Sequence, residues 1–276
     1  MAFSTGLGSI ARHSRKRFRG LSLPLRGHQE IHRDGTPWGQ TGSVRAVFFD
    51  VDFTLIYPGP TFQSEGYLLF ARNHGLVVDV AAFDRAVDSA APILEEPDEA
   101  RYDAEIFVRY TRHILEMMGG RGDALDACAR EISDEWAACR HFELYDEVAD
   151  VLRELVAAGI RIGLISNSHR CLDSFQSHFK LQGLIDYTIS SSDHGYMKPH
   201  PSIFHAALEG VNVFATQAMM VGDHVRQDVE GALGAGMRAA LLHRGPIRHP
   251  SEEDLANRGV PVVRSLRELR DLLFAS

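Results

Sequence analysis

The chain has 276 residues, of which 45% are hydrophobic and 24% charged, with a formal net charge of −8 at pH 7. This is the composition of a soluble globular protein with one large or two modest domains, and no stretch approaches the roughly 18 apolar residues of a membrane helix. The acidic balance argues against general nucleic-acid binding, and three cysteines without CxxC spacing argue against a disulfide framework or a zinc site.

Residues 1–43 differ from the rest of the chain in charge. They carry seven Lys or Arg residues against two acids, a net of +5, which leaves −13 on the remainder. Seven glycines and little apolar periodicity predict a basic, disordered tail. Three alternatives stay open: a targeting leader such as a transit peptide, a tail, or a true start of the protein near Val44.

A buried strand is predicted at the start of residues 44–58. The segment VRAVFFD is apolar and rich in β-branched and aromatic residues, and the loop YPGP follows it. The strand ends in two carboxylates, Asp50 and Asp52, separated by one valine. Solubility alone does not explain two acids so close together at the end of a buried strand.

Residues 59–140 show helical periodicity and no convincing strand. Apolar residues recur at helical intervals and stop at Gly, Pro or a charged turn in four segments, which are residues 61–75, 79–96, 100–120 and 122–140. We therefore expect an inserted all-helical domain.

Helices and strands alternate from residue 141 to the C-terminus. The predicted helices are residues 146–159, 169–180, 200–210, 226–236 and 265–275, and the predicted strands are residues 160–166, 186–190, 218–223, 237–243 and 260–263. This alternation predicts an α/β fold, a doubly wound parallel sheet to which residues 44–58 add a strand. In such sheets ligands bind beyond the carboxyl ends of the strands.

Polar residues gather at those strand ends. Ser166 and Asn167 end the second strand of the sheet, Asp223 ends the fourth, and Lys198 follows the third. Each residue alone has a simple explanation as a turn residue or a helix cap. Their joint arrival at one edge of one sheet, together with the acids of the first strand, indicates a catalytic site.

Four segments, in this order, carry a resemblance to a known family: DVDFT, LISNS, MKPHPSIF and VGDHVRQD. They resemble the motifs of the haloacid dehalogenase-like hydrolases over residues 44–242. The resemblance implies a Rossmann-like core formed by residues 44–58 and 141–276, with residues 59–140 as the helical cap of a phosphatase-type member. Residues 1–43 have no counterpart in the family pattern.

The resemblance also implies roles for individual residues. Asp50 is the expected nucleophile, which forms an aspartyl-phosphate, and Asp52 is the expected proton shuttle, because side chains two apart on an extended segment emerge on the same side. Mg2+ is the expected cofactor, held by Asp50, the backbone carbonyl of Asp52, and Asp223. The phosphate-binding residues implied are Ser166, Asn167 and Lys198, with Thr54 and Asp228 in support.

Asp52 favours phosphate chemistry within the family, because members that remove halide from carbon lack an acid at that position. Two residues depart from the commonest pattern: Phe53 stands where glycine is most frequent, and Gln227 stands where asparagine is frequent. The sequence contains no GxxxxGK[ST] motif, so it does not predict a glycine-rich loop of that kind as the phosphate-binding site.

We therefore expect a cytoplasmic, magnesium-dependent phosphatase acting on a small phosphorylated metabolite, with neither nucleic acid nor a membrane as partner. Two alternatives remain, a phosphotransferase or mutase on the same scaffold and a non-catalytic binding protein. A monomer and a homodimer both stay open. The cap carries no recognisable motif, so the sequence does not name the substrate.

Overall fold

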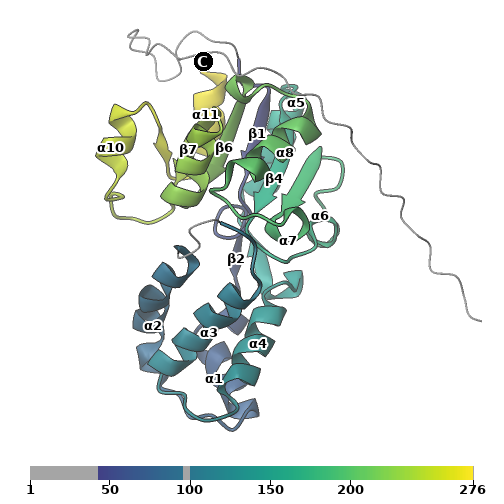
Figure 1. The fold of residues 1–276 in the computed structure, drawn as a ribbon. Coiled ribbons are helices and arrows are strands. Elements are labelled where there is room, and N and C mark those ends of the chain that lie inside the picture. The colour runs from purple at the N-terminus through teal and green to yellow at the C-terminus, as the bar shows by residue number, and fades with distance from the viewer. Residues whose placement is uncertain (1–42, 96–99, 276) are drawn as a thin grey trace, which may run out of the picture. The chain divides into compact units, whose positions relative to one another are not determined.

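Six parallel strands form the central sheet in the computed structural model, which describes residues 43–95 and 100–275 (Figure 1). The strands are β1 (Ala46–Phe49), β4 (Arg161–Ser166), β5 (Tyr187–Ser190), β6 (Ala218–Gly222), β7 (Arg238–Leu242) and β8 (Val262–Val263). They lie in the order β5-β4-β1-β6-β7-β8, which is the order of a doubly wound sheet. The predicted fold class is confirmed, and the order of the strands reverses direction between β1 and β6.

The side chains of β1 pack in two separate cores, because successive side chains of a strand point to opposite faces of the sheet. All four of its residues are fully buried. Val47 and Phe49 belong to one buried apolar cluster, and Ala46 and Phe48 belong to the other. This explains why the segment is a continuous apolar run instead of an alternating one.

Helices cover both faces of the sheet. The first core receives side chains from α5 (Val148–Ala157), α6 (Leu172–Phe179) and α11 (Leu266–Phe274). The second core receives side chains from α8 (Pro201–Val211), α9 (Gly231–Gly234) and α10 (Glu252–Asn257). A short helix, α7 (Ser191–His194), follows β5. Neither α7 nor α10 was predicted from the sequence.

Local residues set the bounds of α8. The side chain of His200 accepts from the backbone N–H of Ser202, Pro201 occupies the first turn, and Asn212 ends the helix in the left-handed conformation. Proline in the first turn and asparagine in a left-handed C-cap are favoured residue types, and the His200 ring takes the capping role that Ser, Thr, Asp or Asn more often fills. The helix therefore begins at Pro201, three residues after Lys198.

The predicted helix over residues 226–236 differs in form. Residues Val225–Glu230 make a π-helix, and only Gly231–Gly234 continue as α-helix. The backbone N–H of His224 donates to Asp228 at 3.0 Å, and the His224 ring accepts from Gln227 N at 3.3 Å. These bonds hold a wide turn that keeps Asp228 buried, and such turns often accompany functional sites.

Four α-helices lie within the described part of residues 59–140: α1 (Ser64–Asn73), α2 (Phe83–Ala90), α3 (Glu105–Met117) and α4 (Leu125–Glu135). Figure 1 shows them gathered together, apart from the helices of the sheet. They correspond to the four predicted helical segments. The domain boundaries stay a prediction, and we keep the name cap for residues 59–140.

A small antiparallel pair of strands flanks the cap. Strand β2 (Ile56–Pro58) pairs with β3 (Phe142–Leu144), with Pro58 opposite Phe142. The sequence analysis did not predict this pair, since strands of three residues are too short to show a period of two.

The predicted basic tail, residues 1–43, lies outside the described residues except for Ser43. None of the helices in the described ranges combines the length and the apolar character needed to cross a membrane.

Candidate active site

Acids follow two neighbouring strands at the point where the strand order reverses. Asp50 follows β1 directly, and Asp223 follows β6. Oxygen atoms of Asp50, Asp223 and Asp228 all lie within 4.8 Å of one another. Ser166 ends β4 on the other side of β1, and Lys198 reaches the same edge from the loop after α7. The structure thus brings together the acids, the hydroxyl and the amine that were placed at strand ends.

Lys198 links two of these acids. Its Nζ atom donates to Asp50 Oδ1 and to Asp228 Oδ1, both at 2.6 Å. The Lys198 side chain is 1% exposed, and those of Asp228 and Asp50 are 2% and 11% exposed. A buried ammonium group needs such partners, and Asp228, which was expected only as a supporting residue, supplies one.

Burial and close charges shift the pKa values of this cluster. Burial raises the pKa of Asp50 to about 7, although Lys198 acts in the opposite direction. Burial alone would lower the pKa of Lys198, but the carboxylates of Asp228 and Asp50 outweigh it, so that this pKa is raised. The lysine is therefore a permanent cation at the site.

Asp223 has a more open position. Its side chain reaches solvent, while the surrounding protein partly withdraws it from water. That withdrawal, followed by the negative charge of Asp50, raises the pKa of Asp223 well above its usual value. Shifts of this kind concentrate at functional sites.

The side chain of Asn167 forms two hydrogen bonds with the backbone of Lys198. Its Oδ1 accepts from Lys198 N at 2.7 Å, and its Nδ2 donates to Lys198 O at 2.9 Å. Nδ2 also donates to Gln227 Oε1 at 3.0 Å. Both hydrogen-bonding groups of the Asn167 side chain thus bind the backbone of Lys198. Gln227, which stands where asparagine is frequent, also accepts from Asn167 and so connects the segment after β6 to the loop after β4.

Ser166 and Thr54 are both buried at the site. The Ser166 hydroxyl shares a hydrogen bond with Ser168 Oγ at 2.9 Å. The Thr54 hydroxyl has no hydrogen-bond partner within the part of the chain that the structure describes. A buried hydroxyl without a partner lowers stability.

Asp52 and Phe53 lie in the loop between β1 and β2, next to the cap. The Asp52 carboxylate, 19% exposed, accepts from Arg170. Phe53 adopts a left-handed backbone with φ of 60°, and its ring, 44% exposed, lies 6.4 Å from that of Trp136, directly after α4. The aromatic ring in place of glycine therefore points toward the cap.

Two arginines at the site were not identified from the sequence. Arg170 donates to Asp52, and Arg244 donates to Thr54 O at 3.0 Å and to Glu147 Oε1 at 2.7 Å. The guanidinium carbon of Arg244 also lies 3.6 Å from the ring centroid of Tyr145. Sequence offered no signal for either residue, since arginine beside a predicted helix or loop is ordinarily exposed.

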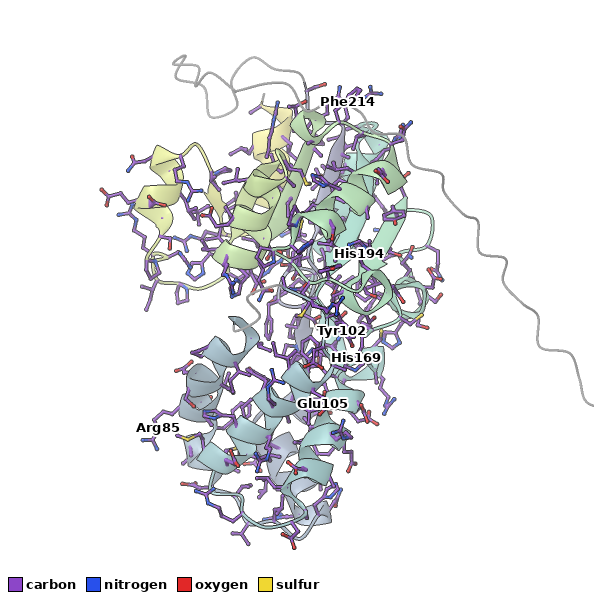
Figure 2. All side chains as sticks on the ribbon, in the orientation of Figure 1. Arg85, Tyr102, Glu105, His169, His194 and Phe214 are labelled. Carbon is purple, nitrogen blue, oxygen red and sulfur yellow. The ribbon has the colours of Figure 1, made fainter. Side chains whose placement is uncertain are left out.

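The cap and the core meet near Tyr102 and His169, which Figure 2 labels at the level between the two groups of helices. The backbone N–H of Tyr102 donates to Gly195 O at 3.0 Å, and the ring centroids of Phe107 and His169 are 6.1 Å apart. Burial lowers the pKa of His169.

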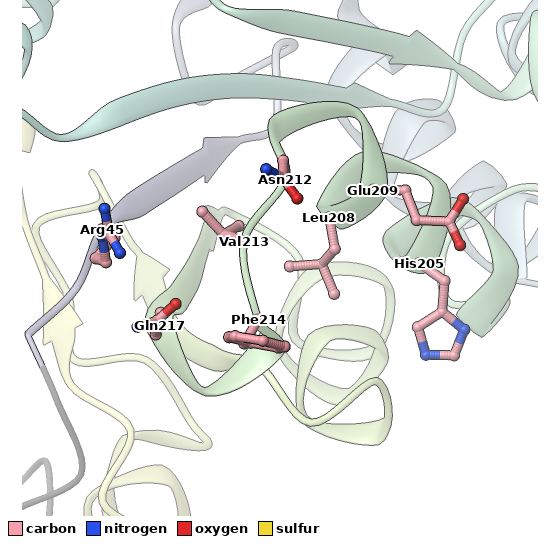
Figure 3. A pocket seen from close by; sticks show the side chains of 8 residues that line it. All are labelled: Arg45, His205, Leu208, Glu209, Asn212, Val213, Phe214 and Gln217. Carbon is pink, nitrogen blue, oxygen red and sulfur yellow. The ribbon is translucent and has the colours of Figure 1, made fainter. Parts of the chain in front are cut away.

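A surface cavity of about 440 Å³ lies at the opposite edge of the sheet (Figure 3). Its lining includes Arg45, which precedes β1, and Gln217, which precedes β6. Because the sheet is parallel, the amino ends of these strands are remote from Asp50 and Asp223 at their carboxyl ends. The cavity is therefore not part of the candidate site.

The donor set suits a hard divalent cation. Three carboxylates and one ammonium group converge, so that two negative charges lack a counter-charge. Burial raises the pKa values of Asp50 and Asp223, and the negative charges of neighbouring carboxylates add to this effect. Carboxylate oxygens are the ligands that Mg2+ prefers, and the residues present fit this ion.

The family model for haloacid dehalogenase-like hydrolases matches residues 44–236. The chain belongs to this family. The match spans all of the acids, the lysine and the serine described above, so this cluster is the candidate active site of a haloacid dehalogenase-like hydrolase.

Individual relatives agree with this assignment. Haloacid dehalogenase-like hydrolase domain-containing protein 3 of Homo sapiens is 27% identical over 84% of this chain and 93% of its own. Glyceraldehyde 3-phosphate phosphatase of Methanothermobacter thermautotrophicus is 24% identical over 83% of this chain and 100% of its own. The structure of YfnB from Bacillus subtilis bound to magnesium has a TM-score of 0.63 at 18% identity, covering 84% and 99%, a likeness that shows the fold.

Proposed function

We propose that this haloacid dehalogenase-like hydrolase is a magnesium-dependent phosphatase that acts on a small phosphorylated metabolite through an aspartyl-phosphate on Asp50. The arrangement of Asp50, Lys198 and Asp228 carries the proposal: a buried carboxylate is held by a permanent cation at a strand end, with a second acid, Asp52, two residues on. The phosphatase name of the archaeal relative supports the reaction class.

Asp50, Asp223 and the backbone carbonyl of Asp52 would hold the cation, and the convergence of carboxylate oxygens from Asp50 and Asp223 supports this. When bound, Mg2+ withdraws charge from the phosphoryl oxygens, which otherwise repel an attacking carboxylate. Asp50 attacks phosphorus, and the bond from phosphorus to the leaving oxygen breaks. Asp52 gives a proton to that oxygen, since an alkoxide is a poor leaving group.

The second half of the reaction regenerates Asp50. Asp52 takes a proton from water, which attacks phosphorus and releases inorganic phosphate. Lys198 and the hydroxyl of Ser166 hold the phosphoryl oxygens, and Asn167 keeps Lys198 in place through its backbone. Positioning and charge balance of this kind are the main protein contributions to phosphoryl transfer.

The proposal is tested by a screen of phosphorylated metabolites for phosphate release with Mg2+. Activity is expected to disappear with excess EDTA and with Asp50→Asn, whereas Asp173→Asn, the same change at an exposed residue, is expected to match the parent. Full release after exhaustive chelation, or turnover by Asp50→Asn well above background, would contradict the mechanism. Product analysis with a second alcohol as acceptor separates hydrolysis from phosphotransfer. Location in the cytoplasm stays a prediction.

A further inference from the structure

Arg170 is buried with its charge against the proposed proton shuttle. Its side chain is 0% exposed, and that of Asp52 is 19% exposed. A single nitrogen, Nη1, donates to both Oδ1 and Oδ2 of Asp52 at 2.9 Å. Nη2 is therefore available for another partner, and it donates to the backbone carbonyl of Trp136 at 2.7 Å.

The guanidinium group contacts residues from three segments. Asp52 lies in the loop after β1, Trp136 directly follows the cap helix α4, and Phe142 begins β3. Arg170 itself lies in the loop between β4 and α6. The guanidinium carbon lies 4.3 Å from the centroid of the Phe142 ring. Movement of Arg170 away from Asp52 would break contacts with the core loop, the end of the cap and the β2–β3 pair together.

Stability does not explain a charge at this position. Withdrawal of a guanidinium group from water is costly, and apolar side chains of similar volume often replace buried ion pairs without loss of stability. Nε of Arg170 is also buried with no hydrogen-bond partner among the described residues. A methionine would fill the same space without these disadvantages, so the charge is best explained by its action on Asp52.

Arg170 is too deeply buried to meet the substrate, and its action must pass through another residue. We propose that Arg170 is a positioning residue that fixes the carboxylate of Asp52 for proton transfer, an inference that rests on the proposed function. Each carboxylate oxygen has two acceptor positions, so donation from Nη1 leaves one on each oxygen for the leaving group or for water. Without Arg170 the partly exposed Asp52 would populate several rotamers.

Proton transfer by Asp52 matters most when the leaving oxygen is basic. An alkoxide needs a proton as its bond to phosphorus breaks, whereas p-nitrophenolate leaves as a stable anion. The value of kcat/KM reports the step that forms the aspartyl-phosphate, so its ratio between an alkyl phosphate and p-nitrophenyl phosphate measures the contribution of Asp52. A purely structural role of Arg170 would lower both values equally.

The experiment compares the parent, Arg170→Gln and Asp52→Asn, each loaded with Mg2+, on p-nitrophenyl phosphate and on the alkyl phosphate that ranks first in the metabolite screen. Arg170→Gln is expected to lose about 10- to 100-fold in kcat/KM on the alkyl ester and less than about threefold on the aryl ester, below the loss for Asp52→Asn. Arg153→Gln, which changes an exposed arginine on α5, is the matched control and is expected to keep both values.

Three further measurements separate positioning from folding. Arg170→Lys keeps a cation but cannot serve Asp52 and Trp136 O together, and it is expected to show the same selectivity with a smaller loss. In the Asp52→Asn background, Arg170→Gln is expected to leave the ester ratio unchanged. Urea unfolding of the metal-free proteins is expected to show non-additive effects of the two substitutions, because either one alone leaves a charge unpaired.

The outcomes distinguish this inference from the function on which it rests. Phosphate release from neither ester by the parent would overturn the proposed function and the role of Arg170 with it. Release by the parent, with equal losses on both esters in Arg170→Gln and Arg170→Lys, would overturn the inference alone. If Arg170→Gln changed the ester ratio in the Asp52→Asn background as much as it does in the parent, the inference would also be overturned.

Discussion

A Cβ atom at Gly222 would lie 2.2 Å from the carboxylate of Asp228. Gly222 is the last residue of β6 and precedes Asp223, so the backbone of the sheet approaches the buried acid that holds Lys198. Glycine is needed here for close approach and not for an unusual backbone angle, since Gly222 is absent from the residues with positive φ.

Gly222→Ala is therefore expected to displace Asp228 and weaken its ion pair with Lys198. We expect a loss of stability of about 1–3 kcal/mol, as for overpacking of a filled site, and a fall in kcat. Urea unfolding and steady-state kinetics measure both effects. Gly234→Ala is the matched control: a Cβ there meets nothing within 4 Å, and at this last residue of α9 stability is expected to change by less than about 0.5 kcal/mol. Equal behaviour of the two variants would contradict the packing argument.

The pKa of Asp50 predicts how the stability of the metal-free protein depends on pH. The value is raised from 3.8 to about 7, so the protonated carboxyl is favoured by folding. Its contribution to stability is present below about pH 4 and is lost as the pH rises through 7. Asp50→Asn has no carboxyl group to titrate at this position, so its melting temperature is expected to rise relative to that of the parent by about 10 °C between pH 4 and 8. Parallel pH curves for the two proteins would refute this.

Mg2+ is expected to reverse that loss. A cation that binds only the folded protein stabilises it by about 2.7 kcal/mol at 100 times its Kd, and ionised carboxylates bind it better than protonated ones. The rise in melting temperature with Mg2+ is therefore expected to be larger at pH 8 than at pH 5. Asp223→Asn is expected to abolish the rise, and Asp173→Asn to preserve it. An undiminished rise in Asp223→Asn would place the ion elsewhere.

Phe53 combines a strained backbone with an exposed ring directed at Trp136. Phe53→Ala removes the ring and keeps the left-handed conformation, which costs about 1–2 kcal/mol for a residue with a Cβ. Phe53→Gly removes both, so it is expected to unfold at higher urea concentration than Phe53→Ala. Both variants are expected to change the ranking of phosphate esters by size while keeping the Mg2+ dependence of the parent. A complete and equal loss on every ester by a folded variant would refute the role in substrate choice.

Much of this architecture could be predicted from the sequence, because the apolar runs of the core strands and the periodicity of the helices are long enough to read. Acids at the ends of β1 and β6 could be placed at one edge for the same reason. The pairing of β2 with β3 and the burial of Arg170 could not be predicted. The first depends on strands of three residues, and the second depends on partners that are distant in sequence and are brought together only by the fold.

The direct pairing of Pro58 with Phe142 has a consequence for how this chain could vary. The chain leaves the core and returns to it at two facing positions of one antiparallel pair, which a tight turn of two residues can also join. The whole intervening segment is thus attached to the core like the loop of a single hairpin. Insertions, exchanges or deletions within it can alter the surface that meets a substrate while the register of the six-stranded sheet, and with it the placement of Asp50 and Asp223, is preserved.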